Sequence, residues 1–189
     1  MSIVATASPE GPTPREYGAI FDGSYYLEKS GGISPLADFG VTFWIKNIDF
    51  LGSPSNTVTL MKTFGTYPLA IKAQSPSTLI VSLGNPSVDF SVTLGSPFGS
   101  TWTLISVWRS ADKVTVYQDS LKQTVTPLVT SATNIDVDSL LIGWENPDRL
   151  ARFDLYDFRL YSQKLYDNIP ALLFSDMTLN DGNKTLPPV

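Results

Sequence analysis

A succession of short β-favouring runs extends from residue 24 to residue 161, and it constrains the fold more than any other feature of this sequence. Each run is rich in Val, Ile, Thr or aromatic residues, and clusters of Gly, Pro, Asn, Asp or Ser separate it from the next. Such spacing predicts an all-β protein, either a sandwich or a barrel. The predicted strands are Ser24–Lys29, Val41–Ile48, Val58–Phe64, Leu69–Ala73, Thr78–Leu83, Val88–Leu94, Trp102–Arg109, Lys113–Gln118, Leu140–Gly143 and Phe153–Tyr161.

Hydrophobic patterning separates exposed strands from central ones. Lys113–Tyr117 alternates Val with polar or amphipathic residues, which is typical of a strand with one face in water. Val41–Ile45 and Trp102–Trp108 carry apolar side chains on both faces, so we expect central strands of a sheet that is covered on both sides or curved over a ligand groove. Because large aromatic side chains dominate β-sandwich cores, we assign the tryptophans of these strands to the core. They are Trp44, Trp102 and Trp108.

Proline sets the two ends of the chain apart from the β region. Residues 8–14 contain three prolines, which remove backbone donors and fix φ, so residues 1–16 are predicted to form an N-terminal arm. The sandwich is predicted to occupy residues 17–178, followed by a C-terminal tail at residues 179–189. Helical spacing is confined to residues 162–177, where Pro170 limits it to one short helical turn.

Composition excludes several classes of site and partner. The chain has 0 Cys and 0 His, so disulfides, zinc sites with these ligands and Ser-His-Asp triads lack the residues they need. The net charge is −5 and the basic residues are scattered singly, so nucleic acid is not an expected partner. Apolar runs are far shorter than the roughly 20 residues of a membrane-spanning helix, so no membrane partner is expected either.

Seven motifs in chain order resemble the laminin-G-like, concanavalin-A-like jelly-roll superfamily. The resemblance covers residues 18–166 and implies an antiparallel two-sheet β-sandwich of the jelly-roll type. The sequence departs from the family pattern at Asp119-Ser120, where the usual hairpin is Asp-Gly, and at Tyr156, where an acidic residue is common. The motifs are Phe21–Leu27, Phe39–Lys46, Leu60–Lys62, Trp102–Val107, Val114–Asp119, Leu141–Gly143 and Asp157–Leu165.

The same resemblance allows one metal, calcium. Calcium-binding members supply two or more acidic ligands close together, and here the matching candidates are Asp154 and Asp157, with Asp22 as a third. Calcium takes about six to eight oxygen ligands, and the sequence pattern does not assemble that number. The pattern therefore requires no cofactor.

Some members of the superfamily are glycoside hydrolases, but the carboxylates needed for that chemistry are not in place here. The relatives resembling this fold carry two Glu and an Asp at alternating positions of one strand, so that a carboxyl pair faces the groove. The four Glu of this chain fit no such pattern; they are Glu10, Glu16, Glu28 and Glu145. Asp154 and Tyr156 share a strand face, but a Tyr nucleophile of the sialidase kind needs a cluster of several more Arg. We expect a protein that is not an enzyme.

One predicted loop carries the residue types that bind sugars. Jelly-roll lectins stack an aromatic ring on the sugar and satisfy its hydroxyls with polar side chains, and residues 143–149 supply Trp144, Asn146, Asp148 and Arg149. A second hairpin presents Tyr67. The alternative is structural: Trp144 folds back over the rim of the sandwich, residues 146–148 only make the turn, and the second hairpin is ordinary.

The combined expectation is a non-catalytic, lectin-like domain that binds glycans through rim loops and is displayed on a virion or particle surface. The first basic residue is Arg15, so no secretory signal is expected, and display would follow cytoplasmic synthesis of a viral or phage structural protein. The arm and tail would join neighbouring capsid or tail subunits, and homo-oligomers fit the same picture. The alternative is a structural capsid-decoration or fibre module without glycan binding, in which Trp144 anchors a protein interface.

Overall fold

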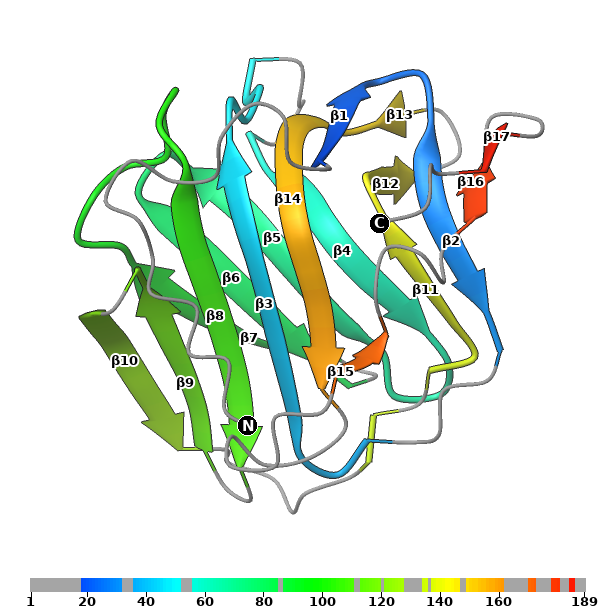
Figure 1. Ribbon diagram of the computed structural model, residues 1–189. Helices are drawn as coiled ribbons and strands as arrows, with labels where there is room; N and C mark the ends of the chain where they lie inside the picture. Colours follow the sequence, from blue (N-terminus) through cyan, green and yellow to red (C-terminus); the bar gives the residue numbers. More distant parts are fainter. Residues whose placement is uncertain are drawn as a thin grey trace, which may run out of the picture.

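Two antiparallel sheets face one another across a common core (Figure 1). The computed structural model describes residues 18–31, 36–51, 56–84, 87–110, 113–119, 121–127, 134–135, 137–146, 149–161, 170–172, 178–180 and 184–185. Of the sandwich and the barrel that the strand spacing allows, the structure is a sandwich, and the two-sheet jelly roll implied by the family resemblance is confirmed. In the described part of the chain no helix is long and apolar enough to cross a membrane.

Each sheet is described by the order of its hydrogen-bonded strands. Sheet A is β1 (Gly18–Asp22), β14 (Arg152–Tyr161), β3 (Phe39–Lys46), β8 (Thr103–Ser110), β9 (Lys113–Gln118) and β10 (Leu121–Pro127), and β15 (Pro170–Leu172) also pairs with β14. Sheet B is β17 (Lys184–Thr185), β16 (Thr178–Asn180), β2 (Tyr26–Ser30), β11 (Ser139–Ile142), β4 (Val58–Phe64), β5 (Leu69–Ser75), β6 (Thr78–Leu83) and β7 (Val88–Thr93). A separate hairpin joins β12 (Trp144–Asn146) to β13 (Arg149–Leu150).

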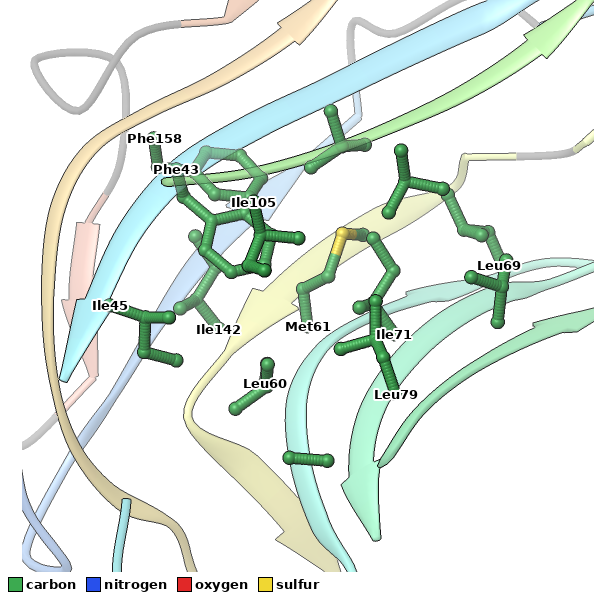
Figure 2. Packing of buried hydrophobic residues seen from close by; sticks show 14 of the residues in the cluster. Phe43, Ile45, Leu60, Met61, Leu69, Ile71, Leu79, Ile105, Ile142 and Phe158 are labelled. Atoms are coloured by element: carbon green, nitrogen blue, oxygen red, sulfur yellow. The ribbon is translucent and has the colours of Figure 1, made fainter. Parts of the chain in front are cut away.

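Alternate residues of the central strands fill the space between the sheets. Phe43 of β3 and Phe158 of β14 stack with ring centroids 6.2 Å apart, and they face side chains of sheet B such as Met61 and Ile71 (Figure 2). Burying such apolar area stabilises the fold by about 25 cal/mol per Å². The period of two in these strands thus places one row of each strand in the core.

The structure adds strands that the sequence pattern does not predict. β1 and β10 lie at the edges of sheet A, where short strands with polar residues or a terminal Pro carry a weak pattern. Within the predicted helical turn the described residues, Pro170–Leu172, form strand β15, and the rest of that segment lies outside the described residues, as does the arm at 1–16. Parts of the predicted tail pair onto sheet B through β16 and β17.

The assignment of Trp44, Trp102 and Trp108 to the core is wrong. All three are half-buried and none belongs to the core cluster. Trp44 lies opposite Tyr156 and Leu104, in the row of sheet A that alternates with buried Phe43 and Ile45. The outer rows of β3 and β8 mix large apolar residues with polar ones, and the size and hydrophobicity of Trp44 and Trp108 led to their assignment to the core.

The outward rings of sheet A pack on their own neighbours. Trp108 lies so close over Gly40 that a Cβ there would come within 2.0 Å of its ring, and its centroid is 5.3 Å from that of Tyr161. Trp102 contacts Tyr156 edge-on at 6.2 Å, and Nζ of Lys46 lies 4.6 Å from the Trp102 ring. This aromatic face, the outer surface of sheet A, is half-buried at each of these rings.

Gly143 redirects the chain from β11 into the β12–β13 hairpin. Its φ of +79° lies in the left-handed region, and a Cβ at this position would come within 2.4 Å of the Phe21 ring. Its amide donates to the Leu60 carbonyl at 3.1 Å, and its carbonyl accepts from the Ala151 amide at 2.8 Å. Glycine is required here for both its backbone conformation and the space it leaves.

Gly143→Ala should therefore lower the free energy of unfolding by about 3 kcal/mol, the sum of left-handed strain and a clash with Phe21. The matched control is Gly31→Ala, because Gly31 also has positive φ, +68°, but nothing lies within 4 Å of the point that an added Cβ would occupy. The control should lose only about 1 kcal/mol. Urea unfolding of both variants measures the difference, and equal losses would contradict the close approach.

Candidate binding site on the outer face of sheet B

Trp144 lies against sheet B rather than in an open loop. It begins β12 and is half-buried, with its ring centroid 5.5 Å from that of Phe64 and the two planes at 67°. Nζ of Lys62 lies 4.6 Å from the Phe64 centroid and 5.2 Å from the Trp144 centroid. We call Lys62, Phe64 and Trp144 the aromatic–lysine cluster.

The cluster stands at one side of a continuous cross-strand row. The partners in register along this row are, in order, Asp89, Ser82, Ala70, Lys62, Leu141 and Glu28. Ala70 and Leu141 are each 6% exposed, yet neither belongs to the core cluster between the sheets. Since side chains alternate along a strand, this row lies on the outer face of sheet B. Ala70 and Leu141 are therefore buried although they point away from the core between the sheets.

Two lysines give this face a local positive charge. Lys72 of β5 lies opposite Thr59, diagonally across from Lys62. Burial lowers the pKa of Lys62, and the like charge of Lys72 lowers it further. Among the described residues, neither lysine forms an ion pair with a carboxylate. The arrangement combines aromatic rings with cations, and it offers donors to a ligand that stacks on a ring.

The structure brings together only part of the predicted sugar-binding set. Trp144 is in the cluster, whereas Tyr67 is 37% exposed at the tip of the β4–β5 hairpin, and Phe64 at the base of that hairpin is the residue that touches Trp144. Asn146 and Arg149 are paired in register where the β12–β13 hairpin closes. Asp148 lies outside the described residues.

Each of the three predicted calcium ligands has its own polar partners. Asp22 accepts hydrogen bonds from the amide and hydroxyl of Ser24, and these bonds lower its pKa. Asp154 accepts from Asn47 at 2.7 Å and lies 3.8 Å from Nζ of Lys46. Within the ranges that the structure describes, no group of three or more acidic residues could hold a metal ion.

Asp157, the third of these carboxylates, belongs to a β-bulge. Its φ is +49°, and the pairing of β14 with β3 shifts register between Tyr156 and Arg159. Its carboxylate accepts from Nε of Arg159 at 2.8 Å. Asp is among the residues that tolerate left-handed backbone, so the bulge explains this residue without a metal.

Sequence reasoning missed Lys62, Phe64 and Ser82. Each sits in a predicted strand, and the pattern alone does not say which outward-facing residues of different strands become neighbours. The available signal was the alternation in Val58–Phe64, which puts Lys62 and Phe64 on one face. Pairing with the distant strands β11 and β5 was needed to place them beside Leu141 and Ala70.

Comparisons with known proteins agree on the fold. No protein-family model and no curated protein matches this sequence. The native heptameric SAP-like pentraxin from Limulus polyphemus has a TM-score of 0.59 at 14% identity, over 82% of this chain and 74% of the pentraxin. Domains LG4-5 of the mouse laminin alpha1 chain have a TM-score of 0.62 at 11% identity, over 82% of this chain and 44% of that one.

The binding domain of botulinum neurotoxin DC, solved in complex with rat synaptotagmin II, has a TM-score of 0.54 at 17% identity, over 74% of this chain and 40% of that one. This chain thus spans less than half the length of the laminin and neurotoxin fragments. The likenesses show that this chain has the jelly-roll fold that these proteins share, as the strand motifs predict.

The effect of the Lys72 charge on the pKa of Lys62 can be tested by substitution. Because the charge of Lys72 lowers the pKa of Lys62, Lys72→Gln should raise the pKa of Lys62 part of the way toward 10.5, leaving the lowering caused by burial. A side-chain NMR titration measures this shift. Lys113→Gln, on the exposed end of β9 in the other sheet, should leave the pKa of Lys62 unchanged.

The lowered pKa of Lys62 also makes the free energy of unfolding depend on pH. Between the lowered pKa of Lys62 and 10.5 the unfolded chain binds more protons than the folded one, so this group makes stability rise with pH across that window. Lys72→Gln should narrow the window. An unchanged Lys62 titration in that variant would show that the two charges do not interact.

Proposed function

We propose that this domain is a non-catalytic module that binds glycans on the outer face of sheet B. The observation that carries the proposal is the Trp144 ring, which is held beside Lys62 and Phe64 by the turn at Gly143. A sugar ring stacks on an aromatic face, and lysine donates to its oxygens without needing a metal.

The fold neighbours support a binding role. A native pentraxin, laminin LG domains and a neurotoxin binding domain share the jelly roll, and the last was solved in complex with rat synaptotagmin II. In this proposal the binding site moves from the rim loops, where the sequence predicts it, to the face of sheet B. The ligand lies on the sheet face beside Trp144, and the β12–β13 and β4–β5 hairpins border it.

A glycan array probed with the unaltered protein and with Trp144→Ala tests this function. Loss of one stacking ring should weaken binding of any glycan hit by about tenfold or more. Trp102→Ala is the matched control, because Trp102 is also a half-buried ring but lies on the aromatic face of sheet A. Circular dichroism confirms that both variants fold. The absence of any hit with the unaltered protein would refute glycan binding.

The aromatic face of sheet A supports a second candidate, a protein-interaction module. Three of the 4 Trp of the chain lie on or beside it, and Trp and Tyr are enriched among residues that dominate protein interfaces. If this candidate is correct, Trp44→Ala should reduce association with a protein partner, measured by sedimentation, while Trp144→Ala should not. Weaker association of the Trp144→Ala variant with unchanged association of the Trp44→Ala variant would instead place the protein contact on the outer face of sheet B.

Display on a virion is the part of the proposal that rests on the sequence. In this setting the Pro-rich segment at residues 8–14 joins the domain to a neighbouring subunit or a second copy. The heptameric state of the pentraxin, which shares this fold, supports assembly of several copies. Deleting residues 1–16 should leave the sandwich folded and abolish assembly, which light scattering measures. If the protein still assembles after the deletion, residues 1–16 do not join the subunits.

A further inference from the structure

Two lysines near the middle of the outer face of sheet B have no ion-pair partner among the described residues. They are Lys62 and Lys72, which lie diagonally across β4 and β5. Burial and the mutual repulsion of the two lysines disfavour the charged form of Lys62, which lowers its pKa. An anion bound between them would relieve this repulsion.

A buried hydroxyl on the same face lacks a partner. Ser82 of β6 is 4% exposed, and its Oγ has no hydrogen-bond partner among the described residues. Its neighbours in the strand, Val81 and Leu83, belong to the core between the sheets, so Ser82 points to the outer face. A buried hydroxyl left unpaired is unfavourable, and a ligand oxygen would supply the missing acceptor.

The smallest side chain of the row lies between these donors. Ala70 is opposite Lys62 on one side and opposite Ser82 on the other, and Lys72 lies two residues farther along the same strand. Ala70 is therefore flanked in register by two lysines and one serine, and Nζ of Lys62 lies beside the Phe64 and Trp144 rings. These rings are within reach of the same ligand.

The ends of the row carry the opposite charge. Asp89 is exposed and lies opposite Ser82, and Glu28 lies opposite Leu141. An extended polyanion laid along this row would meet a carboxylate at each end. A single anionic group bound over Ala70 would lie nearest to the two lysines and Ser82. It would be too short to reach Asp89 or Glu28 at the ends of the row.

We infer that the glycan bound here carries a single anionic group, a carboxylate or a sulfate ester, seated above Ala70 between Lys62, Lys72 and Ser82, while its neighbouring sugar stacks on Trp144. This inference rests on the proposed glycan binding and adds the ligand class. Charge-assisted hydrogen bonds from two lysines supply affinity, and the flanking carboxylates supply selectivity against polyanions.

Calorimetric titration of the full chain with four probes tests the inference. The probes are lactose, sialyllactose, lactose sulfate and a short heparin oligosaccharide. At least one of the two singly charged lactose derivatives should bind about tenfold more tightly than lactose, and the one that does identifies the anion as carboxylate or sulfate. The heparin oligosaccharide should bind no more tightly than the better of these two.

Variants locate the anion. Lys62→Met and Lys72→Met keep the aliphatic stem and should each weaken binding of the charged probe by about tenfold. Lys72→Met should leave lactose binding unchanged, whereas Lys62→Met also removes a donor to the neutral sugar and should weaken lactose binding less than binding of the charged probe. Ser82→Ala should weaken it by about threefold. The matched control Lys113→Met removes an exposed lysine of sheet A and should change nothing. Thermal unfolding confirms that each variant is folded, and Lys72→Met serves on its own if Lys62→Met is not.

Three results would overturn the inference while leaving glycan binding intact. They are lactose binding as tightly as its charged derivatives, heparin binding more tightly than either, and charged-probe binding that is indifferent to both lysine substitutions. A glycan array without any hit would instead refute the proposed function itself.

Discussion

The packing of the two inner sheet faces is the interaction on which the rest of this structure depends. The chain has 0 Cys, so no disulfide crosslinks the sheets. Buried aromatic and aliphatic side chains from both sheets hold them together, and rings such as those of Phe43 and Phe158 stack within this layer. Because β-strands alternate their side chains, fixing one row of each strand in the core also fixes which residues face outward.

The candidate site follows from that constraint and from one backbone turn. With Ile142 and Met61 held inside, Leu141 and Lys62 must face out. Gly143 then reverses the local course of the chain beneath Phe21 and places Trp144 on the same outer face. The site is thus built on rigid strands of the sandwich and needs no long loop for its central residues.

The two outer faces of the sandwich differ in chemistry. Sheet A presents rings that pack mainly on each other and on glycine, with acidic and basic side chains already paired, as in Asp154 with Lys46. Sheet B presents Lys62 beside Trp144, Lys72 diagonally across from Lys62, and a buried hydroxyl that has no partner in the described part of the chain. Desolvated, unneutralised polar groups are costly to maintain, which is why the second face is the better candidate for a polar ligand.

The sequence alone determined the all-β class and the central strands, because β periodicity and turn residues are local signals, and the order of its strand motifs indicated the jelly-roll type through a family resemblance. It also identified Trp144 as an exceptional residue, since a tryptophan among polar and proline residues stands out without any knowledge of contacts. From the sequence, Trp44 and Trp108 are expected in the core, because apolar side chains occur on both faces of their strands and a large aromatic ring is usually buried. Only the tertiary structure decided that Lys62, Lys72 and Ser82 occupy positions around Ala70 on one face of sheet B, since β4, β5 and β6 must pair in register before these positions become neighbours. Register is set by the packing of the whole sandwich, and a shift of one residue would have turned every one of these groups to the other face.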